Sequence, residues 1–346
     1  MKVFSRYLIY RLENSTLRTV IFTILSVAIT QMVVSESTGR MYAENNETGI
    51  YILAIILGLF CTLIPILETA AFKNRRNLDT LYFFPIKREK MALVHFLSGY
   101  IQIAIIYSVS FFSAYWYLAA QTNYFRLEYM MLYYQLSLLV GLVMYSVFMF
   151  LFGQGNTVAD GVIFCVLWMF VIYLIAYVVR TEILRPYLQE HNMLENSVGI
   201  AEWGIIYAPI NNLTVIFQDV IEVNREAHAY DYTNVYAQRY LSQAYMFFIW
   251  GVVGVAAAIG YFVTFVKKGA QKAGEISDSW FGYKLLIPAY GYTLILYNGS
   301  TDIGLVLIIA MMVIGYIIYR RGFKFKVSDL IAMGCAVLPL ILNIIF

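Results

Sequence analysis

The residue types that most often carry catalysis or bind metals are few in this chain and far apart. Each cysteine lies inside an apolar stretch, and the histidines are widely separated: Cys61, Cys165, Cys335, His95, His191 and His228. A metal site or a disulfide framework needs paired spacings such as CxxC or HExxH, and the sequence contains neither. We interpret the cysteines as packing residues and the histidines as interface or loop residues.

Motifs for covalent or phosphoryl-transfer chemistry are also missing. The sequence has no GxxxxGK[ST] loop to hold nucleotide phosphates and no GxSxG element to present a nucleophilic serine. The chain therefore cannot hydrolyse ATP by phosphate-loop chemistry, and we expect no catalytic residue, no metal ligand and no cofactor site of its own.

Three carboxylates fall in or beside apolar segments, namely Glu68, Asp160 and Asp302. Placing an ionisable residue inside a membrane costs free energy, so such a residue often indicates a functional site. All three lie near the ends of their segments, which favours helix-start or interface roles over a proton relay. Glu68 could also pair with the basic run that begins at Lys73.

The composition places the whole chain in a membrane. Of 346 residues, 61% are hydrophobic and 13% are charged, and the mean hydropathy is +0.69. Soluble domains have about 45–50% apolar and about 25% charged residues. A water-soluble fold could not bury so much apolar surface, so the sequence predicts a polytopic membrane protein that is all-α.

Nine apolar segments approach the length of roughly 17–25 residues that a membrane-spanning helix needs. They are Leu17–Val34, Ile50–Phe72, His95–Ala120, Met130–Phe152, Gly161–Val179, Ala244–Val266, Leu285–Tyr297, Ile303–Tyr319 and Leu330–Phe346. The sequence therefore predicts about nine spans, six forming a core and three following it.

The distribution of Lys and Arg residues between the connecting segments predicts how these spans are oriented in the membrane. With the N-terminus inside, eighteen of the 24 Lys and Arg residues, including every lysine, fall on the inner side. A nine-span chain then ends outside. The segment Leu285–Tyr297 is short and contains Pro288. If it is re-entrant, the side of the C-terminus changes.

The predicted organisation has three parts. Residues 1–16 form an amphipathic segment on the inner membrane surface, residues 17–266 form the six-helix core, and residues 267–346 form an inner loop with the C-terminal helices. The core contains an inner loop at 73–90 and an acidic outer segment at 180–243. The apolar middle of the outer segment, 203–210, is compatible with a re-entrant helix or with a folded outer cap.

The inner loop, KNRRNLDTLYFFPIKREK, has basic ends, an amphipathic middle and a proline. Composition alone is compatible with a simple topology determinant. However, the residues Asp79, Leu81, Pro85, Ile86, Lys87, Arg88 and Glu89 resemble the loop between spans two and three of type-2 ABC exporter permeases. The turn Phe152–Ala159, with Asn156, and the run Gln271–Glu275, with Gly274 and Glu275, are similar to further elements of the Ytr-like permeases of Gram-positive bacteria.

This resemblance implies a coupling loop that docks on a separate ATPase subunit. Its residues would be Asn77, Leu78, Asp79, Leu81, Pro85, Lys87, Arg88 and Glu89, with second inner-face contacts at Asn156, Gly274 and Glu275. Cytoplasmic ABC ATPase subunits would bind ATP and Mg²⁺, and a second permease chain, identical or related, would complete the pathway. The expected setting is the lipid bilayer of a bacterial cytoplasmic membrane, without a nucleic-acid partner.

The resemblance implies export of a hydrophobic or amphipathic compound, such as an antimicrobial peptide, a lipid or a drug. Two other functions remain open on the sequence: a membrane-embedded sensor or immunity subunit, and an ion-coupled secondary transporter.

Overall fold

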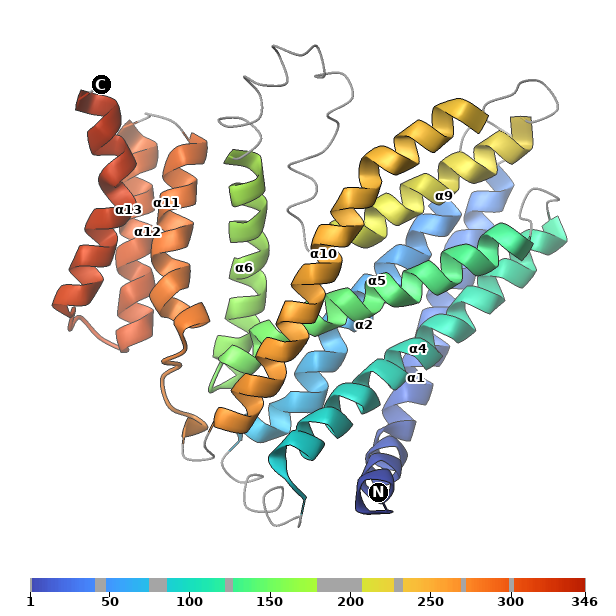
Figure 1. Ribbon diagram of the computed structural model, residues 1–346, viewed down its shortest axis with the longest axis horizontal. Coiled ribbons are helices and arrows are strands. Elements are labelled where there is room, and N and C mark those ends of the chain that lie inside the picture. Colours follow the sequence, from blue (N-terminus) through green and yellow to red (C-terminus); the bar gives the residue numbers. More distant parts are fainter. Residues whose placement is uncertain are drawn as a thin grey trace. The chain divides into compact units, whose positions relative to one another are not determined.

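The computed structural model describes residues 2–40, 48–74, 86–121, 127–178, 207–226, 233–268, 272–298 and 302–345. Every regular element within these ranges is helical, which confirms the all-α prediction (Figure 1). The α-helices are α1 (Lys2–Arg40), α2 (Thr48–Thr69), α4 (Arg88–Gln121), α5 (Leu127–Gln154), α6 (Val158–Val178), α9 (Ala208–Glu226), α10 (Thr233–Lys267), α11 (Leu285–Asn298), α12 (Asp302–Arg320) and α13 (Val327–Ile345). A 3-10 turn, η1 (Ala70–Lys73), follows α2, and a π-helical turn, η4 (Trp280–Lys284), precedes α11.

Six helices in the described residues are long and apolar enough to cross a membrane. These segments are Val3–Glu36, Tyr51–Lys73, Arg88–Gln121, Leu127–Gln154, Val158–Ile175 and Met246–Lys267. They correspond to the six spans of the predicted core. The last three predicted spans coincide with α11, α12 and α13, so helices are present there, whereas the count of nine crossings stays a prediction.

Several predicted features lie outside the described residues. Asn77, Leu78, Asp79, Leu81 and Pro85 of the predicted coupling loop are among them, as are 179–206 and 227–232 of the outer segment. Within that outer segment, 208–226 is the helix α9, with Pro209 in its first turn, where a missing backbone N–H costs nothing.

The chain divides into two compact units. Unit 1 contains Met1–Thr69, Tyr82–Phe150 and Pro209–Lys267, and unit 2 contains Ala70–Leu81, Leu151–Ala208 and Lys268–Phe346. Each unit therefore combines segments that are distant in the sequence.

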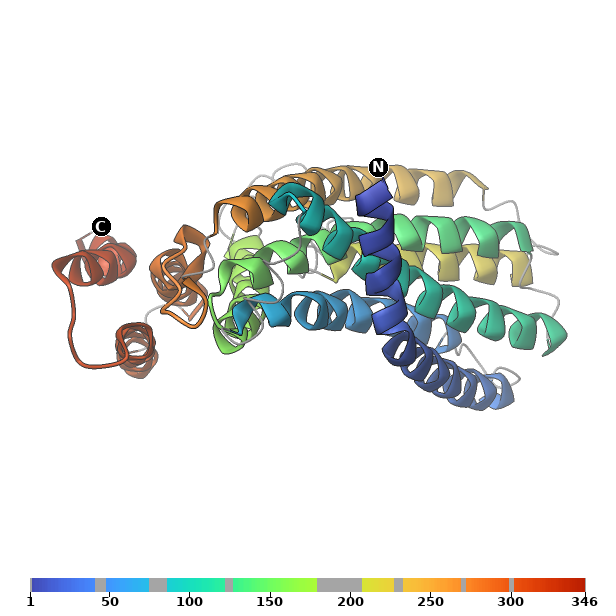
Figure 2. The ribbon, with the colours of Figure 1, turned by 90° about the horizontal axis from the view of Figure 1, so that it is seen from below.

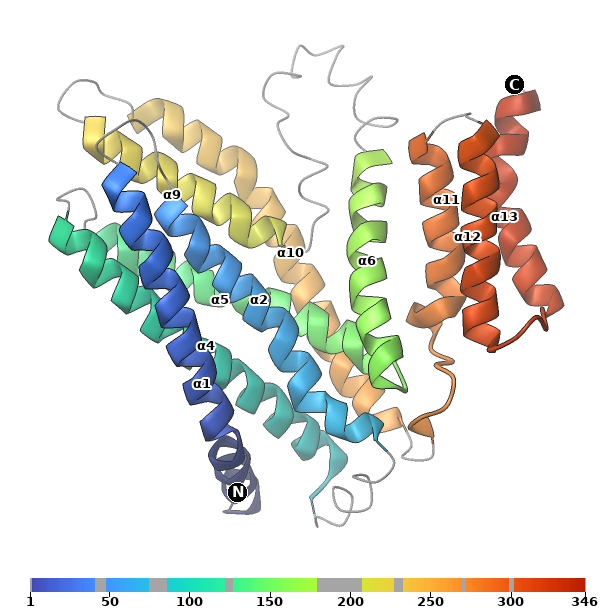
Figure 3. The ribbon, with the colours of Figure 1, turned by 180° about the vertical axis from the view of Figure 1, so that it is seen from behind.

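In unit 1, α1 runs along α4, and α2 packs against both of them (Figure 3). Helix α9 buries one face made of Ile210, Leu213 and Phe217. Phe217 packs on the Tyr133 ring of α5, with the ring centroids 5.0 Å apart, and the Tyr133 hydroxyl shares a 3.0 Å hydrogen bond with Thr214. α9 is thus an amphipathic helix held against α5.

Helix α1 is one continuous element that contains residues 2–16 of the predicted surface segment and the first predicted span. It changes direction along its length (Figure 2). The Leu12 carbonyl accepts hydrogen bonds from the hydroxyls of Ser15 (3.0 Å) and Thr16 (2.9 Å). Such back-bonding bends helices, so this cluster is a physical reason for the bend.

The face of α1 that meets α4 is polar. Beyond the bend, Ser26 shares a 2.7 Å hydrogen bond with Ser110, and Gln31 donates to the Ser113 carbonyl at 2.9 Å. We call this face the polar seam of α1. Elsewhere on its surface, α1 exposes apolar side chains: Leu17, Val20, Ile21, Ile24, Leu25 and Met32. Between helices in lipid, hydrogen bonds of this kind contribute to association together with close packing.

In unit 2, α11 packs against α6, α12 and α13. The Trp168 indole of α6 donates a 2.8 Å hydrogen bond to the Phe281 carbonyl in η4. Rings of Phe164 and Tyr283 meet edge to face with centroids 4.8 Å apart. These contacts fix the segment before α11 against the first half of α6.

Candidate functional site

Two polar clusters stand out in the described residues, one in each unit. The first, in unit 2, surrounds the turn that joins α5 to α6. We call it the α5–α6 joint and define it as residues 152–161, with Lys73, Lys268 and 274–277.

Two lysine side chains cap the C-terminal end of α5. The Lys73 ammonium donates to the carbonyls of Phe152 (2.6 Å) and Gly155, and it lies 4.2 Å from the centroid of the Phe152 ring. The Lys268 ammonium donates to the carbonyls of Gly153 (2.9 Å), Gln154 (3.2 Å) and Gly155 (2.6 Å). A helix C-terminus leaves carbonyls without intrahelical partners and carries partial negative charge, so it is a favourable place for two cations.

Burial opposes the charge on these lysines. It is the main reason why the pKa of Lys268 falls to about 8, and the nearby ammonium of Lys272 lowers this pKa further. The carbonyls therefore hold an amine whose neutral form is accessible near physiological pH.

The turn itself is very tight. A Cβ atom added at Gly155 would lie 2.7 Å from the Cα atom of Gly161, so no larger residue fits without moving backbone. The Thr157 hydroxyl accepts a 3.0 Å hydrogen bond from the Asp160 N–H group and so caps the start of α6. Glycine at 155 and threonine at 157 together let the chain reverse direction here.

The joint brings together two of the predicted inner-face contacts. The Gly274 N–H group donates to the Asn156 carbonyl at 3.1 Å, and the Asn156 side-chain amide donates to the Ile276 carbonyl at 3.1 Å. Gly274 has a φ of 77°, a left-handed conformation that favours glycine. The neighbouring Glu275 has an exposed side chain, and its N–H group donates to the Lys272 carbonyl at 3.2 Å.

Asp160 closes the same joint from the α6 side. Its two carboxylate oxygens accept hydrogen bonds from the hydroxyls of Ser277 (2.7 Å) and Tyr283 (2.9 Å). Ser277 also accepts a 2.7 Å hydrogen bond from the Asn156 N–H group. The prediction that Asp160 lies at the start of a helix is confirmed. The sequence did not predict that its carboxylate would accept hydrogen bonds from the segment before α11.

Three of the predicted coupling residues, Lys87, Arg88 and Glu89, are described, and they lead into α4 in unit 1. Lys87 and Glu89 are exposed. Arg88 begins α4, and one of its Nη atoms lies 3.5 Å from the Val266 carbonyl at the end of α10.

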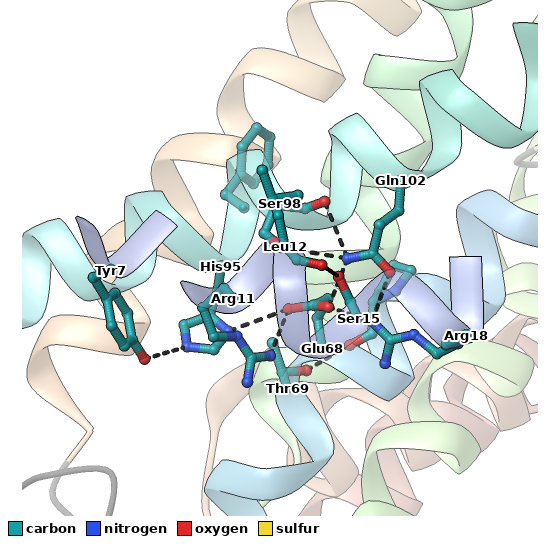
Figure 4. Close-up of polar contacts among 12 residues, drawn as sticks. Tyr7, Arg11, Leu12, Ser15, Arg18, Glu68, Thr69, His95, Ser98 and Gln102 are labelled. Carbon is teal, nitrogen blue, oxygen red and sulfur yellow. Dashed lines mark hydrogen bonds and ion pairs between the residues drawn. The ribbon is translucent and has the colours of Figure 1, made fainter. Parts of the chain in front are cut away.

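The second cluster, in unit 1, surrounds Glu68 (Figure 4). Glu68 lies in the last turn of α2 and is wholly buried. One carboxylate oxygen accepts from Arg11 at 2.8 Å, and the other accepts from Arg18 and, at 2.8 Å, from the Gln102 amide of α4. We call these residues, together with Tyr7, His95 and Ser98, the Glu68 cluster.

A second line of contacts extends from the carboxylate to the start of α1. The Nδ1 atom of His95 lies 3.4 Å from a Glu68 oxygen, and its Nε2 atom lies 3.2 Å from the Tyr7 hydroxyl. Because the carboxylate only accepts, a neutral His95 donates from Nδ1 and accepts from Tyr7 at Nε2. The cluster thus ties α1, α2 and α4 together through one buried anion.

Lys73, the first residue of the basic run, does not pair with Glu68 but caps α5. Among the described residues, the arginine partners of Glu68 are Arg11 and Arg18, while Arg75 and Arg76 of the run lie outside the described residues. The arginines are seven residues apart, two helical turns, and therefore share a face of α1. That spacing was the available signal, but the interpretation of 1–16 as a separate surface segment concealed it.

The Glu68 cluster is a poor candidate for acid–base or metal chemistry, because arginine and amide donors already occupy its carboxylate. Within the described ranges, no group of three His, Cys, Asp or Glu side chains could hold a metal ion. Its arrangement is suited to holding helices in place. The α5–α6 joint, where several predicted inner connections meet, is the stronger functional candidate. No family model matches this chain, and neither a curated protein nor a solved structure matches it.

Proposed function

We propose that this chain is the membrane-spanning subunit of an ATP-driven ABC exporter, working with ATPase subunits on separate chains. A second permease chain would complete the pathway, and the cargo would be a hydrophobic or amphipathic compound. The sequence motifs suggest the family, and the α5–α6 joint is the observation that supports the assignment best.

Three connections between helices meet at the α5–α6 joint. The distribution of Lys and Arg residues predicts that all three lie on the inner side of the membrane. Lys73 is the first residue of the predicted inner loop 73–90. Residues 152–157 form the turn with the second motif, and Lys268 and Gly274 lie in the connection with the third. The second and third motifs are therefore in direct contact in unit 2, through Asn156 and Gly274, and the side chain of Lys73 reaches the same turn.

Such a joint suits a subunit that is moved by a partner. The lysines, Asn156 and Asp160 hold the turn through backbone carbonyls and buried hydrogen bonds, so a displacement of the chain at Lys73 would reach α5 and α6 together. Energetic coupling between distant parts of a protein is carried by packed side chains, hydrogen-bond networks and rigid helices.

The test is whether the chain forms a complex with an ATPase and controls it. The full-length chain would be co-expressed with the ATPase encoded beside it, purified, and reconstituted in liposomes for ATP-hydrolysis assays. We expect co-purification, and we expect Arg88→Glu to weaken it. The matched control is Arg225→Glu, the same charge reversal on the predicted outer side, which should leave the complex intact.

If no complex forms and Arg88→Glu changes nothing, the exporter assignment is wrong. Efflux driven by an ion gradient without ATP would identify a secondary transporter instead. Signalling that persists with a catalytically dead ATPase would identify a sensor subunit.

A further inference from the structure

The loop between α12 and α13 in unit 2 combines basic charge with an exposed aromatic ring. It reads Arg321-Gly-Phe-Lys-Phe-Lys326 and joins two apolar helices. The Phe323 side chain is 82% exposed, and Arg321, Lys324 and Lys326 are exposed as well. We call residues 321–326 the basic-aromatic loop.

The backbone holds this loop in a defined conformation. The N–H group of Gly322 donates to the Ile317 carbonyl at 3.1 Å, and that of Arg321 donates to the Ile318 carbonyl at 3.2 Å. This pattern is the Schellman motif, whose left-handed position glycine usually fills. Here Arg321 fills it with a φ of 52°, and glycine comes one residue later. The backbone at Arg321 is therefore in a left-handed conformation that is unfavourable for an L side chain and that glycine adopts freely.

One acidic residue neutralises part of the charge. The Asp329 carboxylate accepts from Arg320 at Nε (2.9 Å) and Nη2 (2.7 Å), and it also accepts from the Lys326 N–H group at 3.0 Å. Among the described residues, no ion pair is formed by Arg321, Lys324 or Lys326. Three cations therefore remain available to an external anion.

The surroundings point to a membrane surface. The Tyr319 ring at the end of α12 packs on Tyr283 of η4, with centroids 5.4 Å apart, and η4 also carries Trp280, which is 73% exposed. Figures 1 and 3 show the start of α11 and the loop between α12 and α13 at the same end of unit 2. Exposed aromatic rings beside basic side chains are typical of the interface between hydrocarbon and headgroups.

The apolar helices on either side provide the place for acyl chains. Outward-facing residues adjoin the loop on both helices: Ile314, Ile318, Val327, Leu330 and Ile331. A ligand that satisfies both the cations and these side chains needs an anionic head and a hydrocarbon tail. A nucleic acid or an acidic peptide would match the charge alone.

We propose that the basic-aromatic loop binds the headgroup of an anionic phospholipid, with Arg321, Lys324 and Lys326 contacting the phosphate and Phe323 lying among the acyl chains. Such a site differs from a loop that only determines topology, because it predicts selectivity between lipids of different headgroup charge. It stands whether or not the chain is an ABC permease.

The experiment uses the full-length chain in an uncharged detergent and measures lipid binding by native mass spectrometry at low salt. The probes are phosphatidylglycerol and a phosphatidylcholine with the same acyl chains. One basic residue near an anionic surface contributes about fivefold in affinity. The double variant Lys324→Gln with Lys326→Gln should thus weaken phosphatidylglycerol binding about 25-fold and leave phosphatidylcholine unchanged. The control, Lys90→Gln with Lys267→Gln, removes the same charge from two exposed lysines in unit 1 and should have little effect.

Arg321→Gly separates lost binding from lost folding. It should raise the melting temperature, because it relieves the strained φ, while it lowers phosphatidylglycerol affinity by about fivefold. Wild-type affinity in this variant would remove Arg321 from the site. Unchanged lipid selectivity in the double variant, or an equal loss in the control, would overturn the proposal. Displacement of the lipid by soluble glycerol 3-phosphate would also overturn it, because the site would then recognise the phosphate ester alone.

Discussion

Replacement of Glu68 by glutamine tests whether one buried carboxylate holds α1 in place. The structure gives Glu68 two arginine donors and one amide donor, and none of its side chain is exposed. A glutamine oxygen can accept from only one or two of these donors, and its NH₂ group would face a guanidinium. Removing one partner of a buried ion pair costs about 3–5 kcal/mol. Because Arg11 and Arg18 are 19% and 25% exposed, water can replace part of the lost contact. We therefore expect a loss of about 3 kcal/mol.

The assay is reversible unfolding of the purified chain in mixed micelles of mild detergent and SDS, followed by tryptophan fluorescence. The matched background is the double variant Arg11→Gln with Arg18→Gln. There the arginine partners are gone and the buried carboxylate is uncompensated, so Glu68→Gln should cost nothing or even stabilise the chain. The difference of about 3 kcal/mol or more is the coupling energy between the carboxylate and the arginines. An equal cost of Glu68→Gln in both backgrounds would refute the ion-pair account.

Three further predictions concern the α5–α6 joint, each measured by unfolding of the purified chain. Gly155→Ala should destabilise by at least about 3 kcal/mol, because its Cβ atom would meet the Gly161 backbone, whereas Gly251→Ala, with no atom within 4 Å, should be neutral or slightly stabilising. The pKa of Lys268 is lowered from 10.5 to about 8 in the folded chain, so between these pH values the unfolded chain binds more protons than the folded chain does. The free energy of unfolding should therefore rise with pH across this window. It should rise less in Lys268→Met, which lacks the titrating amine. Asp160→Asn should cost about 2 kcal/mol, because one amide oxygen replaces the charged acceptors of two hydroxyls, while unchanged stability would show that those hydrogen bonds have no net value.

Hydropathy predicted the helices well because a membrane-spanning segment must satisfy its backbone internally and hide few charges. The ends were less accurate, since polar residues continue a helix beyond its apolar part. The predicted span at His95 begins seven residues after α4 does. The division of the helices between two units could not be predicted, because the apolar residues of a helix do not specify which other helix they will pack against.

The polar contacts, too, could be predicted only in part from the sequence. Asn156 and Gly274 were singled out one by one through resemblance, yet nothing in the sequence joins residues so far apart, and their contact depends on the tight turn at Gly155. The spacing of Arg11 and Arg18 was readable, but their common partner on α2 was not, because any nearby basic residue was equally plausible.

The polar seam of α1 has a consequence for the order in which the protein is made. A ribosome synthesises α1 before Glu68 and well before Gln102 and Ser110, which are the partners of its arginines and of Ser26. During that interval the seam would face hydrocarbon with no partner, which is costly for two guanidinium groups. The nascent helix should therefore remain at the water boundary or inside the insertion machinery until α4 has emerged. A nascent chain stopped before residue 95 should be extracted by alkaline carbonate more readily than one stopped after residue 121.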